Sequence, residues 1–208
     1  MSHRRPASPA FRGSGLARVR ESLEASARAK LDTLELAGAR IAEAGELLAS
    51  RLRAGGRVLA CGNGGSAADA QHLAAELAGR FDRERPALPA LALTANSSDL
   101  TAIGNDYGFE RVFARLVEAH GRPGDVLVAI STSGNSPNVV AAVERARAAG
   151  LATIALVGKG GGRLAGLADV AIVVPSDVTA RVQECHIAAI HVLCELVDAE
   201  LFPEAAGA

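Results

Sequence analysis

The stretch of sequence that decides the fold is residues 125–137, which reads DVLVAISTSGNSP. Its apolar run at 126–130 is short and uninterrupted, and such runs are typical of parallel strands buried on both faces. Hydroxyl and amide side chains follow at once in residues 131–136. Pro137 suits the first position of a helix, because the N–H group that proline lacks would have no partner there. The stretch therefore predicts a buried strand, a polar loop and the start of a helix.

The polar loop has the composition of an anion-binding site. Its hydroxyl groups belong to Ser131, Thr132, Ser133 and Ser136. The N–H groups of a first helical turn have no partner within the helix, and the helix dipole adds partial positive charge. No Lys or Arg lies between positions 131 and 136, so neutral donors would hold a bound phosphate. The alternative is an ordinary helix N-capped by Ser136, but the loop has more hydroxyl groups than capping requires.

Composition restricts the classes of protein. The chain has 208 residues, of which 49% are hydrophobic and 3% aromatic, and its formal net charge is −1. This length suits one globular domain, and without a basic stripe or aromatic platform the chain is not expected to bind nucleic acid. No apolar run is long enough for a membrane span, and the basic N-terminus lacks the apolar segment of a signal peptide. Three cysteines without a C-x-x-C motif favour a reduced, cytoplasmic setting.

The N-terminal quarter differs from the rest of the chain. We expect residues 1–15, which contain several Arg, Pro and Gly residues, to be a disordered tail, and residues 16–208 to form a single domain. Apolar residues recur at helical spacing over about 16–53, where Gly38 and Gly45 leave open one imperfect helix or two. Because this helical arm precedes the first strand, it cannot cover the sheet as a β-α-β crossover does. We expect it to pack on a partner subunit.

Strand and helix patterns alternate along the remaining sequence. Apolar runs predict strands at 57–61, 86–93, 126–130, 152–157 and 170–174, with helices at 67–79, 109–121, 137–150, near 164 and at 178–202. Residues 94–106 are expected to form a polar loop with one helical turn. The alternation predicts a three-layer α/β/α sandwich with a five-stranded parallel sheet. Ligands of such sheets bind beyond the carboxyl ends of the strands, where the loops 62–66, 94–106 and 131–136 should meet.

A glycine-rich loop follows the first predicted strand. Residues 62–67 match the loose dinucleotide-binding fingerprint G-x-G-x-x-A. That fingerprint also requires an acidic residue at the tip of the next strand, where this chain has Leu93 and Thr94. We therefore interpret the loop as one that lets the backbone approach a ligand, with Asn63 and Ser66 as polar contacts. The alternative is a tight turn between strand and helix.

Two helical pairs contain residue types that bind metals. His72 and Glu76 are four residues apart and share a helix face, although such a pair alone is more often a surface interaction. Gln183 and His191 are eight residues apart on the last helix, which separates them by about 12 Å along its axis. Because bonds from zinc to nitrogen or oxygen are about 2 Å long, one straight helix cannot bring both to one ion. Either the helix bends or starts late, or the two residues serve different subunits; His186 is expected to be structural.

The motifs occur together in the order that is typical of one family. They are GNGGS at 62–66, Gln71-His72 with Glu76, RP at 85–86, GND at 104–106, STSGNS at 131–136, GK-x-GG at 158–162, and TARVQE at 179–184 with His191. On these residues the chain resembles the phosphoheptose isomerases of the sugar isomerase (SIS) family. The resemblance covers about residues 20–202.

The resemblance implies a homotetramer with active sites shared between subunits, and one zinc ion per subunit. It implies that sedoheptulose 7-phosphate becomes D-glycero-D-manno-heptose 7-phosphate, the first step towards nucleotide-activated heptose for surface polysaccharide, including lipopolysaccharide. The implied zinc ligands are His72, Glu76, Gln183 and His191, with Glu76 and His191 also the implied catalytic pair. The implied substrate contacts are Asn63, Gly64, Gly65, Ser66, Glu76, Asn105, Asp106, Ser131, Thr132, Ser133, Ser136 and Gln183. A shared site would resolve the separation of Gln183 and His191.

The competing interpretation is a non-catalytic SIS protein, either a sugar-phosphate sensor or a protein that associates with a replication initiator. The initiator-binding relative has the same loops but lacks the acid at the position of Glu76 and the histidine at the position of His191. This chain has both residues, which favours the enzyme. An isomerase of a different sugar phosphate also stays open. Some isomerases carry an acid where this chain has Ala180, so contacts to substrate hydroxyl groups are expected to differ there.

Overall fold

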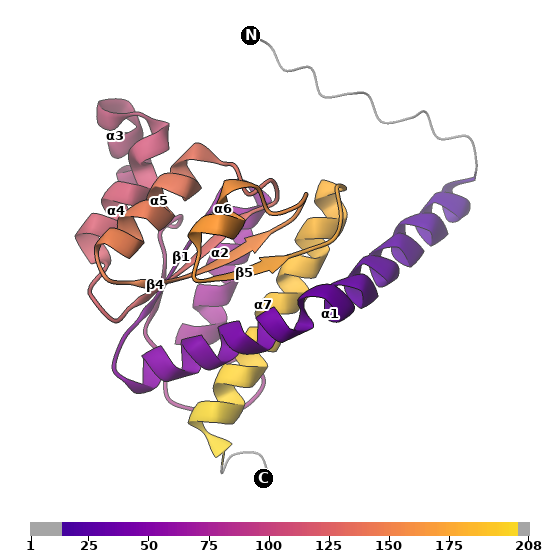
Figure 1. The fold of residues 1–208 in the computed structure, drawn as a ribbon, viewed down its shortest axis with the longest axis horizontal. Coiled ribbons are helices and arrows are strands. Elements are labelled where there is room, and N and C mark those ends of the chain that lie inside the picture. Colours follow the sequence, from indigo (N-terminus) through magenta and orange to yellow (C-terminus); the bar gives the residue numbers. More distant parts are fainter. Residues whose placement is uncertain (1–13, 204–208) are drawn as a thin grey trace.

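The computed structural model describes residues 14–203. Its strands form one five-stranded parallel sheet in the order β2-β1-β3-β4-β5, with helices on both faces (Figure 1). The strands are β1 (Val58–Gly62), β2 (Ala90–Ala92), β3 (Val126–Ser131), β4 (Ala152–Val157) and β5 (Val170–Val173). The helices are α1 (Gly15–Arg53), α2 (Gly65–Ala78), α3 (Ser97–Tyr107), η1 (Phe109–Arg111), α4 (Val112–His120), α5 (Pro137–Ala148), α6 (Gly162–Leu167) and α7 (Thr179–Leu201). The predicted three-layer fold is confirmed.

The central strand β3 supplies both hydrophobic cores. Val126, Val128 and Ile130 face a core formed with α1, α2 and α7. Leu127 and Ala129 face the opposite core, formed mainly with α4 and α5. Successive strand residues point to opposite faces, so a strand buried on both sides must be apolar throughout. All six residues of β3 and of β4 are buried, which explains why these strands were predicted from sequence alone.

The strand order changes direction between β1 and β3. The chain leaves β1 through α2, which lies on one face, and leaves β3 through α5, which lies on the other face. The two connections therefore separate at the carboxyl edge of the sheet and create a crevice, which is where open α/β sheets bind ligands. The loops that follow β1 and β3, both predicted to bind a ligand, flank this point.

Part of the N-terminal arm packs within its own chain, while the expected packing on a partner subunit stays a prediction. α1 is one continuous helix, and its second half packs in the first core through Ala44, Leu48 and Leu52. Gly45 permits a close approach to α7, because a Cβ there would lie 2.6 Å from Leu196 Cδ1. The arm therefore covers part of the sheet within its own chain, although it is not part of a β-α-β crossover. Only its first turns project from the body (Figure 1), since Ser26, Ala29 and Thr33 are already buried.

The segment expected to be a polar loop at 94–106 is largely helical. The expectation was wrong because α3 has only a weak apolar face, in which Leu100 and Ile103 are partly buried and no residue is fully buried. Asn96 caps this helix: its side-chain oxygen accepts hydrogen bonds from the N–H groups of Ser98 (3.0 Å) and Asp99 (3.3 Å). Polar residues of this kind favour both loops and helix starts, so composition alone could not separate the two.

The sequence also led to predictions about the N-terminal tail, membrane spans and the cysteines. The tail expected at 1–15 falls mostly on residues 1–13, outside the described range, while Ser14 accepts a hydrogen bond from Ala17 N as the cap of α1. Within residues 14–203 no helix is long and apolar enough to span a membrane. The three cysteines are free and buried. The cytoplasmic setting stays a prediction.

Candidate active site

The loop after β3 has the features of a preorganised anion site. The hydroxyl oxygens of Ser131 and Ser136 lie 3.0 Å apart, and those of Ser131 and Ser133 lie 3.5 Å apart. Ser136 occupies the N-cap position of α5 but makes no side-chain capping hydrogen bond. Its hydroxyl group is therefore turned towards the other serines and not towards the helix. This geometry argues against the alternative of Ser136 as an ordinary cap and supports the interpretation as a phosphate loop.

The phosphate loop, residues 131–136, is fixed by the loop that follows β4. Asn135 accepts a hydrogen bond from Arg163 N (3.0 Å) and donates one to the carbonyl of Ser133 (3.0 Å). Gly134 has a φ of +64°, and a Cβ there would lie 1.9 Å from the carbonyl oxygen of Gly161. Only glycine fits that backbone conformation and that close approach. The G-N dipeptide within the motif is thus a structural requirement of the loop.

The loop after β1 is joined directly to the helix that follows the phosphate loop. The side-chain amides of Asn63 and Asn138 exchange two hydrogen bonds of 2.8 Å each. Asn138 is buried, so this amide pair is a fixed link across the crevice. The side chain of Asn63, expected to contact substrate, is engaged by Asn138. Its substrate contact stays a prediction, and no sequence pattern pointed to Asn138.

The glycines of the β1–α2 loop make room for α7. A Cβ at Gly65 would lie 2.0 Å from Nε2 of Gln183, so the Gln183 amide lies directly against this loop. Gly64 has a φ of +56°, and Ser66 is buried in the first turn of α2. The loop therefore brings Gly64, Gly65, Ser66 and Gln183 together at the carboxyl edge of the sheet. This is consistent with the interpretation as a loop whose backbone can approach a ligand.

Helices α2 and α7 bring three more of the predicted residues together within one chain. Nε2 of His72 lies 3.0 Å from Nε2 of His191 and 3.2 Å from Oε1 of Glu76. The two imidazole rings are 5.1 Å apart and inclined at 48°, and the ring of Phe81 lies 5.4 Å from that of His191. We call His72, Glu76 and His191 the histidine–glutamate cluster. Its members are 119 residues apart in sequence at the widest, so only the packing of α2 on α7 assembles it.

The side chains of this cluster are of types that bind zinc, but in the structure they contact one another directly. Imidazole nitrogen and carboxylate oxygen are ordinary zinc ligands, and ligands at about 2.0 Å in a tetrahedron lie roughly 3.3 Å from one another. The two distances of 3.0 and 3.2 Å are slightly shorter. In residues 14–203 no group of three or more His, Cys, Asp or Glu side chains has the arrangement of a metal site. The chemistry fits the metal, while the contacts are those of hydrogen-bonded partners.

Gln183 does not join the cluster within one chain. α7 runs without interruption from Thr179 to Leu201, so it does not start late. Gln183 and His191 are about 12 Å apart along a helix axis. The Gln183 amide lies at Gly65, while His191 lies at His72. A site shared between subunits, with Gln183 as a ligand from a different subunit, stays a prediction.

Two other predicted contacts lie apart from these residues. Asn105 and Asp106 end α3, where the Asn105 amide donates to Asp106 Oδ1 at 2.8 Å. Both are exposed, and neither has a hydrogen bond to the phosphate loop or the cluster among the described residues. Their substrate contacts stay predictions.

One acidic residue near the cluster was passed over in the sequence. Asp69 precedes His72 by three residues on α2, and its Oδ2 is buried without a hydrogen-bond partner. Burial raises the pKa of Asp69, and the nearby His72 lowers it by a smaller amount. The spacing of three residues was the available signal, since it places the carboxylate one turn before His72 on the same side of α2.

This fold and site define a SIS-domain protein. Residues 23–158 match the SIS domain family, to which the chain belongs. Within that family the chain is a phosphoheptose isomerase, an enzyme, as its relatives show. A phosphoheptose isomerase of Rhodospirillum rubrum is 61% identical over 158 residues, which cover 76% of this chain and 84% of that protein. One of Shewanella loihica is 50% identical over 192 residues, covering 91% and 98%. The structure of phosphoheptose isomerase GmhA from Neisseria gonorrhoeae superposes with a TM-score of 0.85 at 48% identity, covering 89% of this chain and all of that one.

Proposed function

We propose that this enzyme interconverts sedoheptulose 7-phosphate and D-glycero-D-manno-heptose 7-phosphate, the first step towards nucleotide-activated heptose. The observation that carries the proposal is a division of the site into two parts. One part is a loop of serine hydroxyl groups that contact one another at a helix N-terminus. The other is a chain of contacts in which the carboxylate of Glu76 meets the imidazole of His72, which in turn meets that of His191. An aldose–ketose isomerase of a sugar phosphate requires both a grip on the phosphate and an acid–base pair.

The phosphate loop would hold the substrate at its far end. Ser131, Ser133 and Ser136 offer hydroxyl donors, and the first N–H groups of α5 add further donors with the positive end of the helix dipole. A grip on the non-reacting phosphate aligns the reacting carbons, so its binding energy is used for orientation. The Asn63–Asn138 pair holds this loop in register with the loop after β1.

The histidine–glutamate cluster would move the protons. Isomerisation transfers a proton between adjacent carbons through an enediol, with a second proton moving between the two oxygens. Glu76 is the base that we assign to the carbon-bound proton, and His191 is the group that we assign to the oxygens. A positioned acid or base contributes a rate factor of about 10²–10⁴. His72 contacts both partners and so orients them.

We further propose zinc as the cofactor, one ion per subunit. His72, Glu76 and His191 would hold it, with Gln183 from another subunit as the fourth ligand. When bound, zinc would supply Lewis-acid polarisation of the sugar oxygens. Elemental analysis is expected to find about one zinc per chain, and chelation is expected to lower both activity and thermal stability, because a ligand that binds only the folded state stabilises it. Full activity and unchanged stability in metal-free protein would contradict this proposal.

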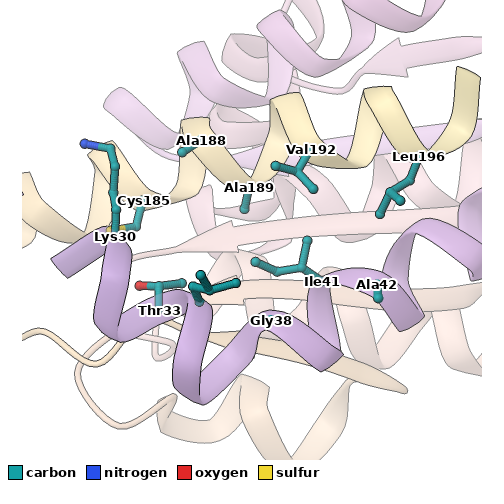
Figure 2. Close-up of a pocket in the computed structure, with 11 residues that line it drawn as sticks. Lys30, Thr33, Gly38, Ile41, Ala42, Cys185, Ala188, Ala189, Val192 and Leu196 are labelled. Carbon is teal, nitrogen blue, oxygen red and sulfur yellow. The ribbon is translucent and has the colours of Figure 1, made fainter. Parts of the chain in front are cut away.

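A homotetramer would complete the shared site, and one surface supports assembly of identical chains. Six large apolar side chains of α1 are 53–73% exposed: Leu16, Val19, Leu23, Leu31, Leu34 and Leu36. Beside them an apolar groove of about 300 Å³ runs between α1 and α7, where Val192 and Leu196 face Ile41 (Figure 2). Exposed apolar surface of this extent is typical of subunit interfaces. We propose that a second copy of this chain covers it.

Light scattering after size exclusion tests the assembly. Leu34→Glu places a charge in the groove and is expected to shift the wild-type tetramer towards smaller species. Phe109→Glu is the control, because Phe109 is similarly exposed but lies on η1, which packs with α3 and α5. A monomeric wild type, or a Leu34→Glu variant that stays tetrameric, would contradict the proposed interface.

The reaction itself is tested with purified enzyme and sedoheptulose 7-phosphate, with the aldose product followed by NMR. Product is expected from wild type. A panel of other ketose and aldose phosphates addresses the second candidate, an isomerase with the same phosphate loop and a different sugar. Faster turnover of another sugar phosphate, with none for sedoheptulose 7-phosphate, would reject the proposed substrate.

A further inference from the structure

A buried ion pair links the two helices that carry the histidine–glutamate cluster. Nε of Arg85 donates to Oδ1 of Asp198 at 2.7 Å, and the two side chains are 1% and 4% exposed. Arg85 lies in the segment between α2 and β2, and Asp198 lies in the last turn of α7. Buried charges are retained only where partners offset the loss of hydration. The remaining contacts of Arg85 therefore indicate what this pair does.

Arg85 binds the carboxyl end of α2. Its Nη1 donates to the carbonyls of Leu77 (2.8 Å), Pro86 (3.1 Å) and Gly79 (3.4 Å), and its Nη2 donates to the carbonyl of Glu76 at 2.7 Å. The last carbonyls of a helix have no partner within the helix and favour a nearby cation. α2 has no basic residue in its own last turn, so Arg85 supplies the charge from outside the helix.

The same residues lie beside the cluster. Glu76, whose backbone carbonyl is held by Arg85, is the residue whose carboxylate contacts His72. On α7, Asp198 follows His191 by seven residues, which is two helical turns, so both lie on the face that meets α2. The two helices therefore meet at two polar points about 10 Å apart. One is the histidine–glutamate cluster, and the other is the Arg85–Asp198 pair.

From this geometry we propose that Arg85 and Asp198 are positioning residues for the isomerase reaction, which set the separation of Glu76 from His191. Neither side chain of the pair contacts the Glu76 carboxylate or the His191 imidazole. The pair therefore acts by fixing α2 against α7. A planar guanidinium reaches Asp198 on one side and several carbonyls on the other, which an ammonium group cannot do. The inference rests on the proposed function, because the cluster must be the acid–base centre for its spacing to affect catalysis.

The test compares Asp198→Asn with a matched variant directly before β3. Asp125 is 4% exposed and accepts hydrogen bonds from Arg57 N and Arg122 N at 2.9 Å each, so Asp125→Asn also removes a buried charge. A displacement of about 1 Å in a catalytic group can cost about a hundredfold in rate. We expect Asp198→Asn to lower kcat at least about tenfold with KM changed less than about threefold, and Asp125→Asn to leave kcat within about twofold.

Arg85→Lys is the second variant and keeps the charge opposite Asp198. We expect a thermal midpoint closer to wild type than that of Asp198→Asn, with kcat again lowered, because lysine cannot hold the α2 carbonyls. Crystal structures of both variants supply a measurement that does not depend on activity: the separation of Glu76 from His191 should differ from that of wild type and of Asp125→Asn. Unchanged separation and kcat in the folded variants would overturn the inference. Inactive wild type would reject the proposed reaction, while the crystal structures would still decide the positioning role.

Discussion

The phosphate loop and the histidine–glutamate cluster are built in opposite ways. The loop is local, because its serine contacts join residues two to five positions apart. The cluster joins His72 and His191 across 119 residues and exists only because α2 packs on α7. The serine contacts of the loop need only one strand end and one helix start, while the loop after β4 steadies them through Asn135. A site between distant helices depends throughout on the contacts that fix those helices against each other. Three changes test this contrast.

The largest effect is expected at the cluster. Glu76→Gln and His191→Gln should each lower kcat at least about a hundredfold, because each removes one partner of the proton transfer. KM should change less than about threefold, because the phosphate loop is untouched. Steady-state kinetics on sedoheptulose 7-phosphate measures both constants. His120→Gln, at the end of α4, is the control and should behave as wild type. Near-normal turnover by either variant would remove that residue from the chemistry.

A second test concerns the stability of the protein at low pH, which depends on a buried histidine of α7. His186 is fully buried, and burial lowers its pKa from 6.5 to about 4, with a smaller opposing effect from the backbone of Val157. Between these values the unfolded chain binds a proton that the folded chain does not, so stability falls as the pH is lowered from 6.5 to 4. The loss is about 3 kcal/mol.

Urea unfolding at several pH values and one protein concentration measures this dependence. His186→Leu replaces the ring with an apolar side chain, and its stability should fall less than that of wild type over the same pH range. If both proteins lose the same free energy of unfolding between pH 7 and pH 4, other groups cause the acid sensitivity.

The smallest effect is expected at the phosphate loop. Ser133→Ala combined with Ser136→Ala should raise KM at least about tenfold, since a hydrogen bond to a charged group contributes about 1.5–3 kcal/mol. The fall in kcat should be smaller than in Glu76→Gln, because backbone N–H donors remain. Ser98→Ala, an exposed hydroxyl on α3, is the matched control. A KM that stays at the wild-type value would mean that the phosphate binds elsewhere and that the loop is only a helix start.

Most of the fold could be predicted from sequence because its signals are local. The strands β3 and β4 are almost entirely apolar, with Ser131 and Thr153 as the exceptions, and Pro137 opens α5 where its missing N–H group costs nothing. The failure at 94–106 has a local cause. No residue of α3 is fully buried, and the polar residues at its start favour loops as well as helix N-termini. The arm at 16–53 was predicted to be helical, but periodicity could not show that it is one continuous helix.

Prediction of the candidate site was likewise restricted to residues that share a local pattern. Spacing predicted that His72 and Glu76 share a face, and the structure adds that Nε2 of His72 contacts both Glu76 and His191. No pattern indicated that Asn138 would pair with Asn63, or that Arg85 would bind the end of α2. These residues have no local motif, because their partners come from distant segments.

The amino-acid sequence by itself determined the alternation of strands and helices, the parallel sheet and the hydroxyl loop before α5, because each follows from hydrogen bonding and hydrophobic periodicity over a few neighbouring residues. Only the tertiary structure decided that His191 meets His72, that Gln183 lies at Gly65, and that Arg85 holds Glu76 to the helix of Asp198. Those contacts depend on the distance and rotation between packed helices, and these are fixed by the shape of the whole core.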